Sequence, residues 1–212
     1  MIKIEAPAFL FDLDGTLVDS TEAVERAWRG WCARVDVDPE PLLEVCHGRQ
    51  SWSTISKFAP HLDARVEDRR MTAAQVDDLT GVREIAGASK LLGSLGRERW
   101  GIVTSCPREL AVVRLRHARI PIPDVLIAAE DVRESKPAPE GFIIGAKRLD
   151  VGPEACVAFE DSVAGVQAAR AAGMRFVTVG ERRHDGAAAS VVDWRSCRAE
   201  VVDGGRRLRI DV

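Results

Sequence analysis

Residues 8–16, Ala-Phe-Leu-Phe-Asp-Leu-Asp-Gly-Thr, decide the fold of this chain. An apolar run that ends in acidic residues predicts a buried strand over residues 8–13. Asp12 and Asp14 are two residues apart, so in a continuing strand both side chains would point to one face. Gly15 then allows the chain to turn sharply. The stretch therefore predicts a pair of carboxylates at the end of a buried strand.

Downstream of residue 84, apolar strand patterns alternate with helical patterns. Strands are expected at 99–104, 125–129, 155–160 and 175–179, and helices at 107–118, 140–149 and 162–172. Alternation of this kind predicts a parallel sheet with helices on both faces. The tail resembles a hairpin around Asp203-Gly204-Gly205, for which the sequence offers no function.

Between residues 20 and 84 the sequence shows no clear strand. Helical spacing of apolar residues predicts helices at 20–34, 39–47, 50–58 and 63–79, the first of them capped by Ser20. We therefore expect an α/β protein with two domains. Residues 1–18 and 85–212 would form the core, and residues 19–84 would form an inserted all-helical domain.

The composition limits the classes of protein that the chain can represent. Its 212 residues carry 30 Lys and Arg against 33 Asp and Glu, a net charge of −3 with the signs well mixed. Nucleic-acid and membrane surfaces favour clustered basic residues, so we expect neither partner. No apolar run reaches the roughly 20 residues that cross a bilayer, and no signal peptide is visible. The five cysteines have no metal or disulfide spacing. We expect reduced thiols in a cytoplasmic monomer.

Polar residues follow the ends of several predicted strands. In an open parallel sheet the ligand lies outside the carboxyl ends of the strands, so these residues should converge although they are far apart in sequence. The set consists of Asp12, Asp14, Thr104, Lys136, Glu160 and Asp161. Each has a structural explanation when taken alone, such as a turn, a helix cap or a surface charge. Their occurrence at successive strand ends indicates a site.

These residue types suit phosphoryl transfer. Asp12, Asp14 and Asp161 form a set of oxygen ligands that fits Mg²⁺, whereas the isolated histidines argue against zinc. An aspartate can form an acyl phosphate, which divides ester hydrolysis into two steps. Asp14 can act as a general acid and then as a general base. Lys136 offers a compact positive charge, and Thr104 a hydroxyl, to the transferring group.

Four ordered motifs resemble those of the haloacid dehalogenase-like (HAD) hydrolase superfamily. They are Phe11-Asp12-Leu13-Asp14-Gly15-Thr16, Ile102-Val103-Thr104-Ser105, Lys136-Pro137 and Phe159-Glu160-Asp161-Ser162. Residues 160–174 are also typical of the family, and the resemblance covers nearly the whole chain. It implies a Rossmann-like core, a small helical cap domain and a magnesium-dependent phosphatase of small phosphorylated metabolites.

The resemblance also implies a role for each residue of the motifs. Asp12 would be the nucleophile, and Asp14 the acid and base. Mg²⁺ would be held by Asp12, the carbonyl of Asp14 and Asp161, with Glu160 either a ligand or a residue behind the ligands. Thr104, Ser105 and Lys136 would hold the phosphoryl group.

Two segments of the insert resemble those of glycerol-1-phosphatases and 2-deoxyglucose-6-phosphatases, namely Cys46-His47-Gly48-Arg49 and Phe58-Ala59-Pro60. They imply that Arg49 and His47 contact the substrate, although His47 could equally be a capping or core histidine. Those relatives often carry Trp-Arg where this chain has Arg49-Gln50. Sugar phosphates, sugar-alcohol phosphates, glycerol phosphate and phosphoglycolate therefore all stay open as substrates.

Four alternatives compete with a phosphatase. A β-phosphoglucomutase-like mutase resembles the chain but carries a cap histidine at the position of Val24. A haloacid dehalogenase proper lacks the second aspartate, which is Asp14 here. A silent binding protein would not need four intact motifs. A catalytic cysteine, for which Cys106 after a strand is the best candidate, has the least support.

Overall fold

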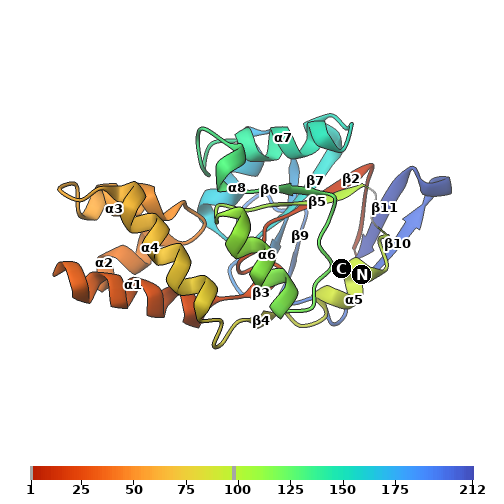
Figure 1. Ribbon diagram of the computed structural model, residues 1–212. Coiled ribbons are helices and arrows are strands. Elements are labelled where there is room, and N and C mark those ends of the chain that lie inside the picture. Colours follow the sequence, from red (N-terminus) through yellow and green to blue (C-terminus); the bar gives the residue numbers. More distant parts are fainter. Residues whose placement is uncertain (1, 97–98) are drawn as a thin grey trace.

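The computed structural model describes residues 2–96 and 99–212, and its centre is a six-stranded parallel sheet (Figure 1). The strands lie in the order β6-β5-β2-β7-β8-β9. Their bounds are β2 Ala8–Phe11, β5 Trp100–Val103, β6 Val125–Ile127, β7 Cys156–Glu160, β8 Arg175–Val179 and β9 Ala189–Val191. All five pairs are parallel. The predicted parallel α/β sheet is confirmed, whereas β9 was not expected.

Strand β2 lies at the centre of the site because its two neighbours end at the same level. Phe11 is the register partner of Ile102 in β5 and of Phe159 in β7. The residues that follow these three positions therefore emerge side by side at one edge of the sheet. This register explains why motifs more than a hundred residues apart in sequence meet.

The strand over residues 8–13 is shorter than predicted, since β2 ends at Phe11. The amide of Asp12 still donates to the carbonyl of Phe159 at 2.9 Å, but the chain then turns, with Gly15 at φ 90°. Asp12 and Asp14 therefore do not share one strand face. This expectation was wrong because the turn that Gly15 permits begins before the second aspartate.

Helices cover both faces of the sheet. The helices α5 Ala88–Gly93 and α6 Arg108–His117 pack with Phe9 and Phe11 on one face. The helices α7 Glu140–Arg148 and α8 Val163–Ala171 pack with Leu10 and its neighbours on the other. The alternation of Phe9, Leu10 and Phe11 between the faces follows the two-residue period of a strand.

An aromatic layer, formed by Phe11, Phe159 and Trp194, packs against one face of the sheet next to the strand ends. The rings of Phe11 and Phe159 stack at 4.6 Å with an interplanar angle of 12°, and Trp194 meets both at 5.9 and 5.6 Å. The indole of Trp194 also donates to the carbonyl of Thr16 at 2.9 Å. The residues directly after Phe11 and Phe159 are therefore anchored to a closely packed part of the core.

The helical insert comprises four helices with their own apolar core (Figure 1). They are α1 Thr21–Val35, α2 Pro39–Cys46, α3 Ser51–Phe58 and α4 Ala64–Asp77. The strand pair β3 Val18–Asp19 and β4 Arg83–Glu84 ties its two connections to the core together. A strand at residues 83–84 was not expected because two-residue strands carry no readable pattern.

Ser20 stands at the N-cap position of α1 but does not cap the helix through its side chain. Its hydroxyl donates instead to Oδ1 of Asp14 at 2.7 Å. The capping prediction was wrong because Ser20 has φ −119° and ψ 11°, whereas a residue that caps a helix through its side chain usually has an extended backbone.

The chain ends in a three-stranded antiparallel sheet. The predicted hairpin is confirmed as β10 Arg198–Val202 and β11 Arg207–Asp211, and β1 Lys3–Ala6 adds to its other side in the order β1-β11-β10. The strand β1 was not predicted. Among residues 2–96 and 99–212, no helix has both the length and the apolar character that crossing a membrane requires.

Candidate active site

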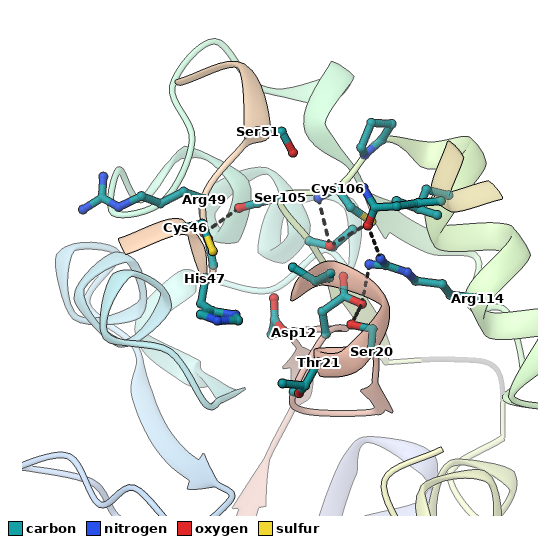
Figure 2. A pocket seen from close by; sticks show the side chains of 18 of the residues that line it. Asp12, Ser20, Thr21, Cys46, His47, Arg49, Ser51, Ser105, Cys106 and Arg114 are labelled. Carbon is teal, nitrogen blue, oxygen red and sulfur yellow. Dashed lines mark hydrogen bonds and ion pairs between the residues drawn. The ribbon is translucent and has the colours of Figure 1, made fainter. Parts of the chain in front are cut away.

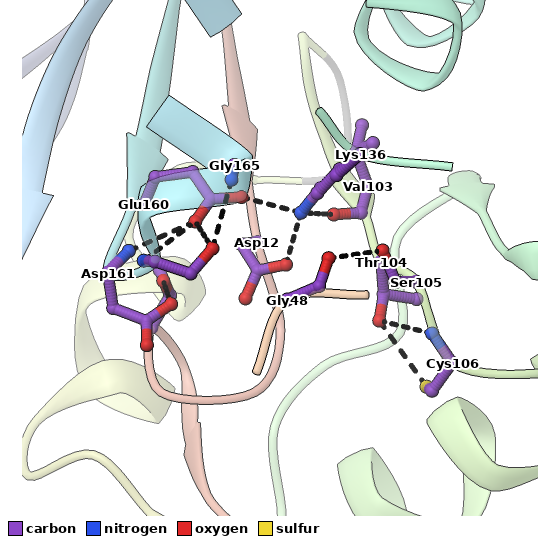
Figure 3. A network of polar contacts seen from close by, with 12 residues as sticks. Asp12, Gly48, Val103, Thr104, Ser105, Cys106, Lys136, Glu160, Asp161 and Gly165 are labelled. Atoms are coloured by element: carbon purple, nitrogen blue, oxygen red, sulfur yellow. Dashed lines mark hydrogen bonds and ion pairs between the residues drawn. The ribbon is translucent and has the colours of Figure 1, made fainter. Parts of the chain in front are cut away.

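The ammonium group of Lys136 lies at the centre of the strand ends (Figure 3). It is an ion-pair partner of Asp12 Oδ1 and donates to Glu160 Oε1 at 2.5 Å and to the carbonyl of Val103 at 2.9 Å. Only 5% of Lys136 and none of Glu160 is exposed. One buried cation thus joins the ends of β2, β5 and β7, as the sequence predicted for Asp12, Lys136 and Glu160.

Burial and neighbouring charges shift the pKa values of Lys136 and Asp12. Burial by itself lowers the pKa of Lys136, but the charges of Asp12 and Glu160 outweigh burial and raise this pKa above its usual range. Burial raises the pKa of Asp12 well above its ordinary value of 3.8, against the opposing effect of Lys136. The lysine therefore stays charged, and the free carboxylate of Asp12 is costly without a further cation.

Glu160 uses both of its oxygens inside the protein. Oε1 accepts from Lys136, while Oε2 accepts from the amide of Asp161 at 3.1 Å and from the hydroxyl of Ser162 at 3.1 Å. A β-carbon on Gly165 would lie 1.8 Å from Oε1, so the N-terminal turn of α8 admits no side chain there. Glu160 is therefore a buried support for Lys136 and for the loop that carries Asp161.

A second acidic feature adjoins this ion pair. Asp12, Glu160 and Asp161 each present an oxygen within 4.8 Å of the others, a group that could hold a metal ion. Burial, and then the charge of Glu160, raises the pKa of Asp161 from 3.8 to about 7. Gly15 makes room for this carboxylate, because a β-carbon there would stand 2.1 Å from Oδ2. Three acids against one lysine leave an excess of negative charge that fits a divalent cation.

Asp14 takes a different position from the one predicted for a metal-site side chain. Its carboxylate turns away from the acidic group and binds Ser20 and Arg114 through Oδ1. The predicted role of its backbone carbonyl toward Mg²⁺ stays a prediction. The side chain nevertheless lines the same pocket as Asp12, so it lies where a reacting group could meet it.

The end of β5 brings Thr104, Ser105 and Cys106 to the site (Figure 3). The hydroxyl of Thr104 accepts from the amide of Cys106 at 3.2 Å and lies 3.3 Å from its sulfur. Ser105 donates its hydroxyl across to the carbonyl of Gly48 in the helical insert at 2.9 Å. Burial raises the pKa of Cys106 to about 12, so the thiol stays protonated and a catalytic cysteine has no support.

Figure 2 shows the pocket above Asp12, which has a volume of about 100 Å³. The helical insert supplies part of its wall, including Val24, His47 and Arg49. His47 and Arg49 are exposed, and the guanidinium of Arg49 extends away from Asp12. Val24 lines the pocket with an aliphatic side chain, which cannot donate a proton.

Two residues of the site were missed by the sequence analysis. Arg114 on α6 binds Asp14 at 2.6 Å, and it also binds Gln75 on α4 of the insert at 2.7 Å. A signal did exist, because Arg114 occupies the same helix face as the buried Leu110, one turn away. A cation on the apolar face of a helix requires a buried partner.

The site matches a known class of enzyme. A family model described as a haloacid dehalogenase-like hydrolase matches residues 6–173. The chain belongs to the haloacid dehalogenase-like hydrolase family, as its four motifs predicted.

Individual relatives narrow the comparison. Hexitol phosphatase A of Escherichia coli (strain K12) is 39% identical, over 81% of this chain and 82% of its own. Glycerol-1-phosphate phosphohydrolase 2 of Saccharomyces cerevisiae is 32% identical, over 84% of this chain and 76% of its own. The crystal structure of CbbY from Rhodobacter sphaeroides in complex with phosphate has a TM-score of 0.79 at 27% identity, over 90% of this chain and 96% of that one. The predicted likeness to glycerol-1-phosphatases is confirmed.

The raised carboxyl pKa values predict an unusual pH dependence of stability. The folded protein binds protons at Asp12 and Asp161 more tightly than the unfolded chain does, because both pKa values lie above 3.8. The free energy of unfolding of the metal-free protein, measured in the presence of a chelator, should therefore fall as the pH rises from 3.8 toward about 7. We expect Tm to be lower at about pH 8 than at about pH 5.5 by at least roughly 2–4 °C, which corresponds to about 1 kcal/mol.

The matched control is Asp161→Asn, which keeps an oxygen for the hydroxyl of Thr16 but cannot ionise. Its Tm should depend less on pH than that of the wild type. The same slope in both proteins, measured by differential scanning calorimetry in chelator, would show that Asp161 does not carry the effect.

Proposed function

We propose that this protein is a magnesium-dependent phosphatase of small phosphorylated metabolites. The observation that carries the proposal is the buried Lys136, which holds the carboxylate of Asp12 in the wall of a pocket that Asp161 also lines. A fixed cation beside a carboxylate can attract the phosphoryl group and orient the nucleophile at the same time. The kinship with hexitol and glycerol-1-phosphate phosphatases supports this assignment.

The reaction would proceed in two halves. One oxygen of Asp12 attacks phosphorus, the bond from phosphorus to the ester oxygen breaks, and Asp14 gives its proton to the departing alkoxide. Water then attacks the phosphorus of the acyl phosphate, Asp14 takes a proton from this water, and the bond between phosphorus and the Asp12 oxygen breaks. The products are the alcohol, inorganic phosphate and the original carboxylate of Asp12.

A divalent cation fits the acidic group next to Asp12. The donors are carboxylate oxygens, which suit Mg²⁺. Burial is the main cause of the raised pKa values of Asp12 and Asp161, and a cation between them would favour their charged forms. Asp12 and Asp161 would hold the ion, and Glu160 would act from behind because Lys136 and the loop amides already use its oxygens. A bound magnesium ion supplies positive charge to the transferring phosphoryl group.

The substrate class follows from the pocket and from the relatives. A volume of about 100 Å³, lined by polar and apolar side chains together, suits a small metabolite with a short carbon chain. Sugar phosphates, sugar-alcohol phosphates and glycerol phosphate are therefore the substrates we propose, with Arg49 and His47 of the insert near the end distant from phosphorus. A phosphosugar mutase is disfavoured because Val24 lines the pocket where its histidine would stand.

Asp12→Asn tests the covalent mechanism. Asparagine has nearly the same shape but is a poor nucleophile, so turnover of glycerol 1-phosphate should fall on the order of 10⁴-fold or more. Mass spectrometry after acid quench should find one phosphoryl group on the wild type and none on the variant. Residual activity within tenfold of the wild type in a folded variant would exclude Asp12 as nucleophile.

The metal requirement has its own test. Activity should disappear in excess chelator and return with Mg²⁺, whereas Ca²⁺ should fail to restore it. Mg²⁺ requires near-octahedral geometry, while Ca²⁺ accepts more ligands and can engage both oxygens of Asp12, which prevents attack. Full activity after exhaustive chelation, with metal content checked by mass spectrometry, would contradict the proposal.

The core and the helical insert should contribute to different parts of catalysis. Lys136→Ala should lower kcat for every ester, because all substrates share the phosphoryl group that Lys136 faces. Arg49→Ala should reduce kcat/KM by roughly ten- to a hundredfold for the natural substrate, the usual effect of one lost charged hydrogen bond. It should leave p-nitrophenyl phosphate nearly unchanged, since this ester has no hydroxyl groups for Arg49. An equal loss on both esters would exclude a specificity role for Arg49.

A further inference from the structure

Arg114 is the most deeply buried arginine beside the pocket, and it links two parts of the chain. Only 2% of it is exposed, although it lies among the residues that line the pocket. Arg114 belongs to α6, and Figure 2 shows its side chain reaching toward Ser20. Its Nη1 donates to Asp14 at 2.6 Å, and its Nη2 to Gln75 at 2.7 Å.

The charges around this guanidinium are unusually few. Asp14 is the acid that neutralises Arg114 within residues 2–96 and 99–212, and the contact with Gln75 is to a neutral amide. The Nε atom of Arg114 is buried without a hydrogen-bond partner. A buried cation that is held by one ion pair and one amide is expensive to maintain, so its position needs a reason beyond stability.

The geometry at Asp14 suggests that reason. Arg114 and Ser20 both bind Oδ1, so neither contact occupies Oδ2. Two donors on one oxygen fix the plane and direction of a carboxylate, while the second oxygen can exchange a proton. This is the arrangement that an acid and base needs, because proton transfer depends on the distance and direction of the donor oxygen.

We propose that Arg114 is a positioning residue, which orients Asp14 for proton transfer, and that Gln75 makes this orientation depend on the helical insert. Gln75 belongs to α4, so Arg114 has its full set of partners only when the insert lies against α6. The inference rests on the proposed role of Asp14. Arg114 itself does not contact the reacting atoms, because Asp14 stands between them.

The test compares two esters that differ in their need for an acid. Glycerol 1-phosphate must release an alkoxide, which requires the proton of Asp14, whereas p-nitrophenolate leaves unprotonated. We compare kcat/KM, because it reports the steps up to phosphoryl transfer. Arg114→Met should lower this value on the order of 10²-fold or more for glycerol 1-phosphate and less than about tenfold for p-nitrophenyl phosphate.

Three variants complete the design. Gln75→Met leaves the pair of Arg114 and Asp14 in place, so it should also lower kcat/KM more for glycerol 1-phosphate than for p-nitrophenyl phosphate, but by a smaller factor than Arg114→Met. This variant replaces Arg114→Met as the test if Arg114→Met does not fold. Arg116→Met removes an exposed arginine from the same helix and should change neither ester. In an Asp14→Asn background, Arg114→Met should cause no further loss, since the group it positions is gone.

The outcomes separate this inference from the proposed function. Equal losses on both esters for Arg114→Met and Gln75→Met, or a further loss in the Asp14→Asn background, would overturn the positioning role while leaving the phosphatase intact. If the wild type hydrolyses neither ester with Mg²⁺ present, the proposed function fails, and the inference fails with it.

Discussion

The buried ammonium of Lys136 is the interaction on which the arrangement of the site depends. Asp12 and Glu160 leave adjacent strands of the sheet, and their carboxylates would repel each other in a water-poor environment. Lys136 stands between them and also binds the carbonyl of Val103 on the third strand. Removing this one cation would leave buried acids without compensation, whereas its presence makes the strand ends a single charged unit.

This charged unit is rigid because of what lies beneath it. The stacked rings of Phe11 and Phe159, with Trp194 against both, fill the sheet face directly behind Asp12 and Glu160. A close-packed interior resists displacement, so the aromatic layer restricts where the carboxylates can move. Apolar packing therefore fixes Phe11 and Phe159, and ionic attraction fixes Asp12 and Glu160, the residues that directly follow them in the chain.

The sequence was sufficient for the features that depend on local pattern and fold topology. Residues that follow parallel strands, either directly or in the next loop, lie at one edge of the sheet, which is why Asp12, Lys136 and Glu160 could be grouped without a structure. The orientation of Asp14 could not be predicted, because it depends on a turn of the chain and on Arg114, which is 100 positions away in sequence. The strand β1 was missed for a similar reason, since its partner is the far end of the chain.

Three contacts between the helical insert and the core differ in their chemistry. Ser105 donates to the carbonyl of Gly48, and Gln50 donates to the carbonyl of Ala129 at 3.0 Å. These neutral side-chain-to-backbone bonds exchange readily for bonds to water, so each contributes modestly to holding the insert in place. The contact through Arg114 differs, because separation from Gln75 leaves a buried guanidinium with one partner fewer. Of these three contacts, the one between Gln75 and Arg114 is therefore the one whose loss would remove a partner from a buried charge.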